Sequence, residues 1–274
     1  MQSARPRIGI SYWRDRGNPR KRQAFESLTD HAEVVWLDPE RSHHDLDALG
    51  LDLFHAAKRR PESLADLDRV ATAGVQTVNP PAAVQVTSDR VARHQALVHA
   101  GVPVPMAEFG AATAVSLTPP VLVKCREEGV LRSHDHGFVA SGGLDYDGDR
   151  LVEAYVPHAT SVKVHVLGDT VRAVHESPTG LEPVPLDPSL EPIVRRVRHL
   201  FGLRVFEVDA VHIGSEDAPD ETVLSWTGES TAEWVVVDVN PVVSLAGVPD
   251  AVSVYQTFLG GLVGIEVPPE SPGA

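Results

Sequence analysis

The sequence predicts an α/β protein in which a small parallel α/β lobe at the N-terminus is followed by α+β lobes. Two observations lead to this prediction. Short apolar segments alternate with helical segments over the first third of the chain, which is typical of a parallel sheet. Longer apolar strands joined by tight turns fill much of the remainder. With 274 residues, the chain can form two or three lobes that share a cleft.

The first lobe is expected to alternate strands and helices. The segment 19–32 is expected to be a helix with Ala24, Phe25 and Leu28 facing inward. Strands are expected at 7–13, 33–38, 51–57 and 74–79.

A break and a further helix are expected next. Neither proline of 79–84 continues a strand or a helix interior, so this segment is expected to interrupt regular structure. Ser88 is a suitable N-cap for a helix over 89–101, which Gly101 would end.

The rest of the chain is expected to be rich in strands. Residues 168–170 would close a hairpin within 160–177. Strands are expected at 119–125, 151–157, 160–177, 203–214 and 233–240. Helices are expected at 187–202, with Ile193, Val197 and Leu200 on one stripe, and at 249–262. The segment 131–141 is expected to be a loop and a returning strand, and 214–233 a surface hairpin.

Composition excludes several classes of protein. The net charge of −14 argues against a nucleic-acid binder. No apolar run reaches the roughly 18 residues that span a bilayer, and 1–11 lacks the apolar core of a signal peptide. The single Cys125 excludes an internal disulfide and a cysteine-based zinc site. We expect a cytoplasmic monomer that binds a small molecule.

Three polar residues in apolar strands are candidate metal ligands. Asp238 and Asn240 lie on one face of a strand, roughly 7 Å apart. Their oxygens suit Mg²⁺, and Asp209 lies inside another apolar strand. Each residue alone could equally be a strand end or a turn cap, so only the set of three indicates a site.

Two of the four lysines also lie in strands. Lys124 follows 121–123, which are apolar without alternation, so it is expected at the end of a buried strand where an ammonium needs an anionic partner. Lys163 shares a face with His165, opposite alternating valines, and this face could be solvated or could line a cleft.

Several well-known motifs are absent. The sequence has no Walker A loop, no G-x-G-x-x-G after the first strand and no G-x-S-x-G elbow. His134 and His136, like His43 and His44, lack a convincing third ligand for a transition metal.

The two strand lysines, the later acid and the final "VDVN" resemble the ATP-grasp superfamily. More closely, the chain resembles the inositol 1,3,4-trisphosphate 5/6-kinase (inositol-tetrakisphosphate 1-kinase) family. The segments that carry this resemblance are "RIGISYW", "VNPPAAVQVTSDR", "VLVKCREEGVLRSHDHGFV", "VEAYVPHATSVKVHVLGDTV", "FGLRVFEVDAV" and "WVVVDVNPVVSLAGVPD". The chain departs from that family at 14–22, which is rich in arginine, and at Cys125, Val243 and Ser244, where the family carries proline, proline and glycine.

The resemblance implies an ATP-grasp fold with four segments. These are an N-terminal α/β lobe at 1–108, a central lid lobe at 109–155, a C-terminal lobe with the metal ligands at 156–266, and a disordered tail at 267–274.

The resemblance also implies an activity: an ATP- and Mg²⁺-dependent kinase that transfers the γ-phosphate to a phosphorylated polyol, an inositol phosphate by similarity. The alternative is an ATP-grasp carboxylate–amine ligase that acts through an acyl phosphate. A nucleotide-binding protein without catalytic activity is a third interpretation. Neither nucleic acid nor membrane is expected as a partner.

Residue roles follow from the same resemblance. Lys163 and His134 would be catalytic. ATP would contact Arg90, Lys124, Glu153, Tyr155, Val156 and Lys163. Mg²⁺ would bind to Asp209, Asp238 and Asn240. The second substrate would contact Arg14, Arg16, Arg20, Lys21, Arg22, His134, His158, Ser244 and Gly247.

Overall fold

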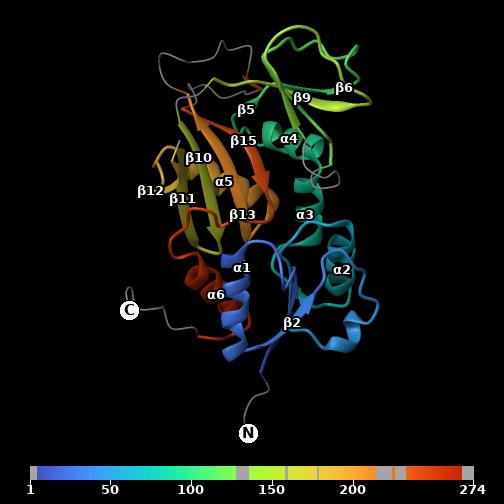
Figure 1. Ribbon diagram of the computed structural model, residues 1–274, viewed down its shortest axis with the longest axis vertical. Coiled ribbons are helices and arrows are strands. Elements are labelled where there is room, and N and C mark those ends of the chain that lie inside the picture. Colours follow the sequence, from blue (N-terminus) through green and yellow to red (C-terminus); the bar gives the residue numbers. More distant parts are fainter. Residues whose placement is uncertain are drawn as a thin grey trace.

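The computed structural model describes residues 5–127, 136–157, 160–177, 179–213, 224–225 and 233–266. Figure 1 shows three sheet regions: the N-terminal sheet at the bottom, a larger sheet above it, and a small sheet at the top right. The mixed α/β class predicted from the sequence is confirmed. Within the described ranges, every helix is too short or too polar to cross a membrane.

The N-terminal sheet is parallel, with strand order β2-β1-β3-β4. Its strands are β1 Arg7–Ser11, β2 Glu33–Leu37, β3 Leu53–Ala56 and β4 Gln76–Thr77. The connections contain α1 Pro19–Ser27, the 3₁₀ turns Leu28–Asp30 and Leu46–Leu49, and α2 Pro61–Thr72. The inward-facing residues predicted for 19–32 are confirmed, because Ala24, Phe25 and Leu28 are fully buried.

Two predictions for the following segment are wrong. Residues 79–84 do not break the structure, because α3 spans Pro81–Ser88 with proline at its first position, where its missing N–H costs no hydrogen bond. Ser88 is therefore the last residue of α3. The next helix, α4 Arg90–His99, is capped by Asp89, whose carboxylate accepts from the N–H groups of Val91 and Ala92 at 3.0 and 3.1 Å.

The small sheet is antiparallel, with strand order β6-β9-β7-β8. Its strands are β6 Ala107–Gly110, β7 Val121–Lys124, β8 His136–Val139 and β9 Arg150–Ala154. Leu122 is the direct partner of both Phe138 and Glu153, so these side chains share one face with Lys124. This face therefore brings Lys124 and Glu153 together.

The larger sheet is also antiparallel, with strand order β12-β11-β10-β13-β15. Its strands are β10 Thr160–Leu167, β11 Thr170–Ser177, β12 Gly180–Val184, β13 Val205–His212 and β15 Trp234–Asn240. The predicted hairpin between β10 and β11 is confirmed, and Gly168 has the positive φ of 59° that its turn requires. The short strands β5 Val104–Pro105 and β14 Leu224–Ser225 pair beside this sheet.

Two helices complete this region. Helix α5 Glu191–Phe201 buries Val194 and Val197, while Ile193 and Leu200 pack at the edge of the same core. Helix α6 Ala251–Leu262 packs against α1, where the Phe25 and Tyr255 rings lie 5.2 Å apart. Figure 1 shows α1 and α6 side by side.

The N-terminal and larger sheets share one apolar core. Ile8 and Leu53 from the first sheet join Val205 from the second sheet and Val243 from the loop after β15 in a single buried cluster. Asn79 adds two polar links, because its Nδ2 donates to the carbonyl oxygens of Val205 at 2.6 Å and Pro241 at 2.9 Å. The relative position of the two sheets is therefore fixed by packing. The predicted segments 214–233 and 267–274 fall mostly or wholly outside the described residues.

Candidate active site

The three predicted metal ligands lie together on the larger sheet. Asp209 of β13 and Asp238 of β15 are direct partners in the ladder, next to a register shift between Asp209 and Ala210. Asn240 lies two residues beyond Asp238, and its Nδ2 donates to Asp238 Oδ2 at 3.3 Å. A strand period of two places Asp238 and Asn240 on the same face, as expected.

Asp238 is held by a buried arginine. Arg93 of α4 is only 3% exposed, and its Nη2 lies 2.5 Å from Asp238 Oδ1. Its Nη1 donates to the carbonyl oxygens of Val239 at 2.9 Å and Thr87 at 3.1 Å. Although burial alone would raise the pKa of Asp238, the positive charges around it, Arg93 first, lower that pKa to about 2. Asp238 is therefore an ionised ligand candidate at neutral pH.

The pKa of Asp209 is shifted in the opposite direction to that of Asp238. Burial raises the pKa of its carboxyl to about 7; Lys163 opposes this shift, and the nearby Asp238 and Glu207 carboxylates add to it. Bringing these acids together is unfavourable unless cations lie beside them, as Lys163 and Arg93 do here.

The donor set fits Mg²⁺. Two carboxylates and one amide supply the hard oxygen atoms that this ion prefers. Asn240 Oδ1 accepts from Arg59 at 2.9 Å, which orients the amide. Across the described ranges, no group of three or more His, Cys, Asp or Glu side chains is arranged to hold a metal ion. The ligand set contains only oxygen donors, which favour Mg²⁺ over the softer metals that prefer sulfur or imidazole nitrogen.

Lys163 is held by carboxylates of the adjacent strand. Its Nζ lies 2.8 Å from Glu207 Oε1 and 2.5 Å from Asp209 Oδ1. Burial alone would lower the pKa of Lys163, but these two carboxylates raise it. The face that it shares with His165 is therefore not a solvated face: His165 is fully buried, with Nδ1 3.1 Å from Glu207 Oε2.

Glu207 joins several parts of the site. Its Oε2 accepts hydrogen bonds from both the backbone N–H and the hydroxyl of Ser244, each at 2.8 Å. Burial alone would raise its pKa, but the hydrogen bond from His165 and the charge of Lys163 lower it. Glu207 therefore connects Lys163 to the loop that follows Asn240.

Lys124 lies where it was predicted, at the buried end of a strand. Only 8% of the residue is exposed, and its ammonium forms an ion pair with Glu153. It also donates to the carbonyl oxygen of Val237 in β15 at 3.3 Å. Its anionic partner is thus the carboxylate of Glu153, a residue that was itself expected to contact ATP.

A small pocket opens between α4 and these strands. Its lining includes Arg90, Arg93, His94, Glu153 and Asp238. Arg90 donates from Nη1 to the carbonyl oxygen of Cys125 at 2.8 Å, which ties α4 to the residue after Lys124. Basic groups thus gather beside Asp238, as a phosphate site requires.

The other residues expected near ATP lie just beyond Glu153. The Tyr155 ring contacts Phe138 at a centroid distance of 5.0 Å, and its N–H donates to the carbonyl oxygen of Pro120 at 3.0 Å. Val156 is buried with Val211 and Val235. These contacts anchor the chain where it passes from the small sheet to the larger one.

The basic residues expected to bind substrate do not form one cluster. Lys21 is buried, and its Nζ donates to the carbonyl oxygen of Ala57 at 3.3 Å. Arg20 donates to the carbonyl oxygen of Val248, and Arg22 to that of Arg14 at 3.4 Å. Arg16 lies beside Lys58 and Arg60 at the Trp13 ring, whereas Arg20 and Arg22 have structural contacts.

Two other residues expected to contact substrate, Ser244 and Gly247, lie in the loop between β15 and α6. Ser244 is held by Glu207, as described above. Gly247 has a φ of 76°, and a Cβ there would lie 2.7 Å from Leu181 Cβ, so packing explains this glycine. His134 and His158 lie outside the described residues.

Sequence reasoning missed Arg93, Glu207 and Arg59. Two of them had a detectable signal: Arg93 is one helical turn from Arg90, and Glu207 is two residues from Asp209 in the same strand. Arg59 reaches Asn240 across 181 positions of sequence, which no local pattern indicates.

Comparisons with known proteins agree with this fold. No family model and no curated protein matches the chain. A RimK-domain ATP-grasp protein from Sphaerobacter thermophilus is 22% identical with a TM-score of 0.70, covering 94% of this chain and all of that one. PurK, an N5-carboxyaminoimidazole ribonucleotide synthetase in an ADP complex, is 13% identical with a TM-score of 0.70, covering 96% of this chain and 78% of that one.

A third solved structure extends this comparison. D-alanine–D-alanine ligase from Bacillus anthracis is 12% identical with a TM-score of 0.65, covering 94% of this chain and 96% of that one. The chain therefore has the ATP-grasp fold, as the order of its motifs predicted. The finer resemblance to inositol phosphate kinases stays a prediction.

Proposed function

We propose that this protein is an ATP- and Mg²⁺-dependent carboxylate–amine ligase that acts on small molecules as a monomer. The observation that carries the proposal is the convergence of Lys124 and Lys163 on the set of Asp209, Asp238 and Asn240. The names of structural neighbours add support, since a synthetase and a D-alanine–D-alanine ligase are among them.

The loop after Asn240 supports a ligase over the predicted kinase. In the kinase family this loop carries Pro-Gly, where backbone approaches the substrate. Here Val243 is fully buried in the core, and Ser244 is held by Glu207. The loop is thus fixed by packing and hydrogen bonds, which disfavours the kinase-like approach.

The proposed reaction has two steps. A carboxylate oxygen of the acceptor attacks the γ-phosphorus of ATP, the bond to ADP breaks, and an acyl phosphate forms. An amine then attacks the carbonyl carbon, phosphate leaves with the C–O bond electrons, and the amine nitrogen loses a proton. The products are an amide, ADP and inorganic phosphate.

The protein's contribution is mainly electrostatic, as is usual for phosphoryl transfer. Lys124 and Lys163 would neutralise phosphate oxygens, with Lys163 kept in place by Glu207. Arg93 keeps Asp238 ionised and oriented. Mg²⁺, when held by Asp209, Asp238 and Asn240, would supply positive charge to the phosphates.

A kinase acting on a phosphorylated polyol is the second candidate. It is favoured by a specific observation: Arg16, Lys58 and Arg60 lie close together at the Trp13 ring of the N-terminal lobe. Such a group suits an anionic acceptor, but it does not distinguish a phosphate from a carboxylate.

The two candidates differ in their products. We would supply Mg-ATP with pools of carboxylic acids, amines and phosphorylated polyols, and measure ADP and free phosphate separately. Hydroxylamine would be added to trap an acyl phosphate as a hydroxamate. The ligase proposal predicts equal release of ADP and phosphate and a hydroxamate, all absent in Asp238→Ala. ADP release with phosphate retained on a polyol would establish the kinase instead.

A further inference from the structure

A group of cations surrounds one aromatic ring at the edge of the N-terminal sheet. The guanidinium carbon of Arg16 lies 4.7 Å from the Trp13 ring centroid, Lys58 Nζ lies 5.2 Å from it, and the Arg60 guanidinium carbon lies 5.7 Å from it. We call these four residues the Trp13 cluster. Each cation gains from the ring, but three like charges around one indole repel one another.

The Trp13 cluster lies where open parallel sheets bind ligands. Trp13 follows the carboxyl end of β1, and Lys58 and Arg60 follow that of β3. The strand order β2-β1-β3-β4 makes β1 and β3 the pair at which the chain changes direction across the sheet. Helix α2 begins immediately after Arg60 without a side-chain cap, which adds the positive end of a helix dipole.

The Trp13 cluster stays positively charged, because the nearby carboxylate of Glu40 neutralises only part of its charge. Glu40 lies 2.6 Å from Arg16 Nη2 and 3.4 Å from Arg60 Nη2, so one carboxylate serves two guanidinium groups. Burial lowers the pKa of Lys58, and the charges of Arg60 and Arg59 lower it further. The indole Nε1 of Trp13 is buried, and it lacks a hydrogen-bond partner within the described part of the chain. An anion beside these side chains would relieve the repulsion among the three cations.

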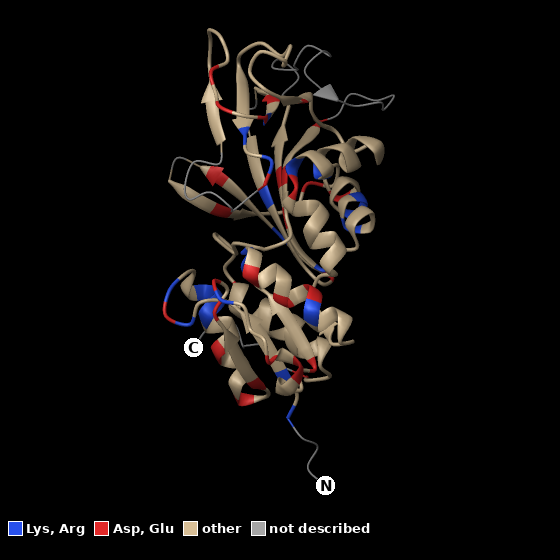
Figure 2. Ribbon diagram, turned by 90° about the vertical axis from the view of Figure 1, so that its right-hand side faces the viewer, with Lys and Arg blue, Asp and Glu red and all other residues tan. Residues whose placement is uncertain are grey.

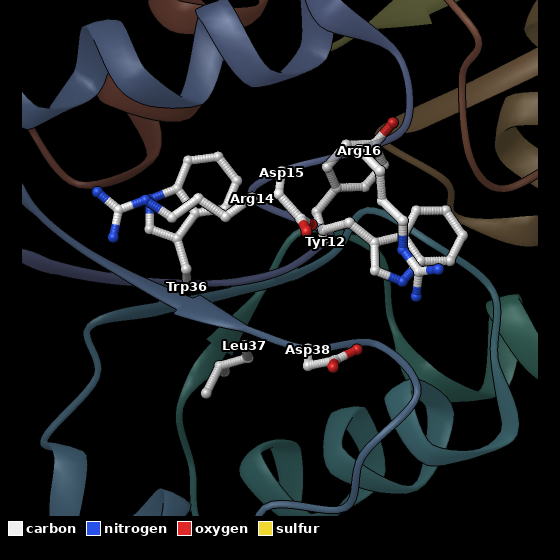
Figure 3. A pocket seen from close by; sticks show the side chains of 8 residues that line it. Tyr12, Arg14, Asp15, Arg16, Trp36, Leu37 and Asp38 are labelled. Atoms are coloured by element: carbon white, nitrogen blue, oxygen red, sulfur yellow. The ribbon is translucent and has the colours of Figure 1, made fainter.

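A pocket beside Trp13 leaves room for a ligand. Its lining includes Trp13 and Arg16, together with Asp15 and Asp38. Figure 3 shows Arg14 extending toward Trp36, away from Arg16, so Arg14 is not part of the cluster. Because the two aspartates repel an anion, its favourable position in the pocket is beside Trp13 and Arg16, where Lys58 and Arg60 approach the Trp13 ring.

The Trp13 cluster is connected to the metal ligands. Arg59, between Lys58 and Arg60, donates to Asn240 Oδ1 at 2.9 Å. The segment 58–60 therefore contributes both to the Trp13 cluster and to the surroundings of Asn240. In Figure 2, a loop at the left of the N-terminal lobe carries several Lys and Arg segments, and others lie along the elements above it.

We propose that the Trp13 cluster binds a second anionic group of the acceptor acid, remote from the carboxylate that receives the phosphate. This inference rests on the proposed ligase function and specifies its substrate class: an acid with two anionic groups. The remote group is a carboxylate or a phosphate, because both match guanidinium and ammonium donors.

Binding without turnover tests this proposal. Calorimetry in the presence of Mg²⁺ and a non-hydrolysable ATP analogue would compare glutarate, 4-phosphonobutyrate and the monoacid valerate. We expect at least one dianion to bind about tenfold more tightly than valerate, since a charged hydrogen bond contributes about that factor. Lys58→Met and Arg60→Met should each remove this preference while leaving valerate binding unchanged. The preferred dianion identifies the remote group.

The matched control is Arg198→Met on α5, whose guanidinium pairs with Asp169 at 3.1 Å, outside the site. It should keep the preference. Equal binding of all three acids, no binding of any, or an unchanged preference in both cluster variants would overturn the proposal. Because binding is measured without catalysis, a failed hydroxamate test with tight dianion binding would reject the ligase and retain the anion site.

Discussion

Lys124 and Lys163 both lie in strands beside the proposed phosphate site, but they are held in different ways. Lys163 is bound by Glu207 and Asp209, two carboxylates from the neighbouring strand of its own sheet. Lys124 pairs with Glu153 in the small sheet and also donates to the carbonyl oxygen of Val237 in the larger sheet. Lys163 therefore belongs to one rigid network, whereas Lys124 links two sheets.

This difference indicates how each lysine is made ready for ATP. A buried ammonium is tolerated only with an anionic partner. Lys163 is already oriented by two partners that need not move. Lys124 must exchange Glu153 for a phosphate, so its contribution depends on the position of the small sheet. We therefore expect Lys124 variants to affect ATP binding and catalysis together, and Lys163 variants to affect mainly kcat.

The largest expected effect is the loss of Lys124. Lys124→Ala should lower kcat/KM roughly 10³-fold or more, because it removes a charge that neutralises the transferred phosphate. It should also lower Tm, since Glu153 is left buried without its ammonium. Steady-state kinetics and thermal unfolding measure the two effects.

A double variant separates these two consequences. Adding Glu153→Gln to Lys124→Ala removes the buried carboxylate that has lost its partner. The Tm should therefore recover, while activity stays lost. Wild-type turnover in Lys124→Ala would refute the phosphate role, and activity that returned together with Tm would show that the lysine is only structural.

A smaller effect is expected at Glu207, which positions Lys163. Glu207→Gln should keep the shape of the side chain but weaken its hold on Lys163 and Ser244. Loss of such a supporting contact costs about 10- to 100-fold in activity. We expect the loss in kcat, with KM for ATP changed less than about threefold.

A double-mutant cycle tests the link between Glu207 and Lys163. If Glu207 acts through the lysine, adding Glu207→Gln to Lys163→Met should cost almost nothing further. Additive losses in the double variant would show that Glu207 acts independently of Lys163.

The sequence predicted the fold well where the signal is local. The apolar run before Lys124 indicated a buried lysine, and the spacing of Asp238 and Asn240 indicated a shared face. The errors arose where one residue type is compatible with two local structures. Pro81 starts helix α3 instead of ending regular structure, and Asp89 caps helix α4 in place of Ser88.

Contacts between distant segments could not be predicted in this way. Arg93 meets Asp238, and Arg59 meets Asn240, only after α4 and the N-terminal sheet pack against β15. The basic residues of 14–22 were all expected to contact the second substrate, yet folding directs Arg20 toward Val248 and buries Lys21. The charge of a sequence segment therefore does not predict where its side chains point in the folded protein.

The smallest expected effect concerns a third lysine, Lys21, which contrasts with Lys163. Burial lowers the pKa of Lys21 to about 7, and the charge of Lys58 adds to this shift, against the opposite effect of Glu207. Between about pH 7 and the ordinary lysine pKa of 10.5, the unfolded chain binds a proton that the folded protein does not. Lys21 therefore destabilises the fold increasingly as pH falls through this window, and the cost is constant below it.

Lys21→Met should consequently raise Tm at pH 7, by about 4 °C, because it replaces a buried amine with an apolar side chain of similar length. The gain should shrink as pH rises toward 10, where wild-type Lys21 costs little. Lys163→Met is the matched comparison: it should lower Tm, since Glu207 and Asp209 lose their shared cation. Thermal unfolding from pH 7 to 10 measures both variants. A Tm difference for Lys21→Met that does not vary with pH would mean that Lys21 is charged in the folded protein, and that its burial is balanced by a carboxylate as it is for Lys163.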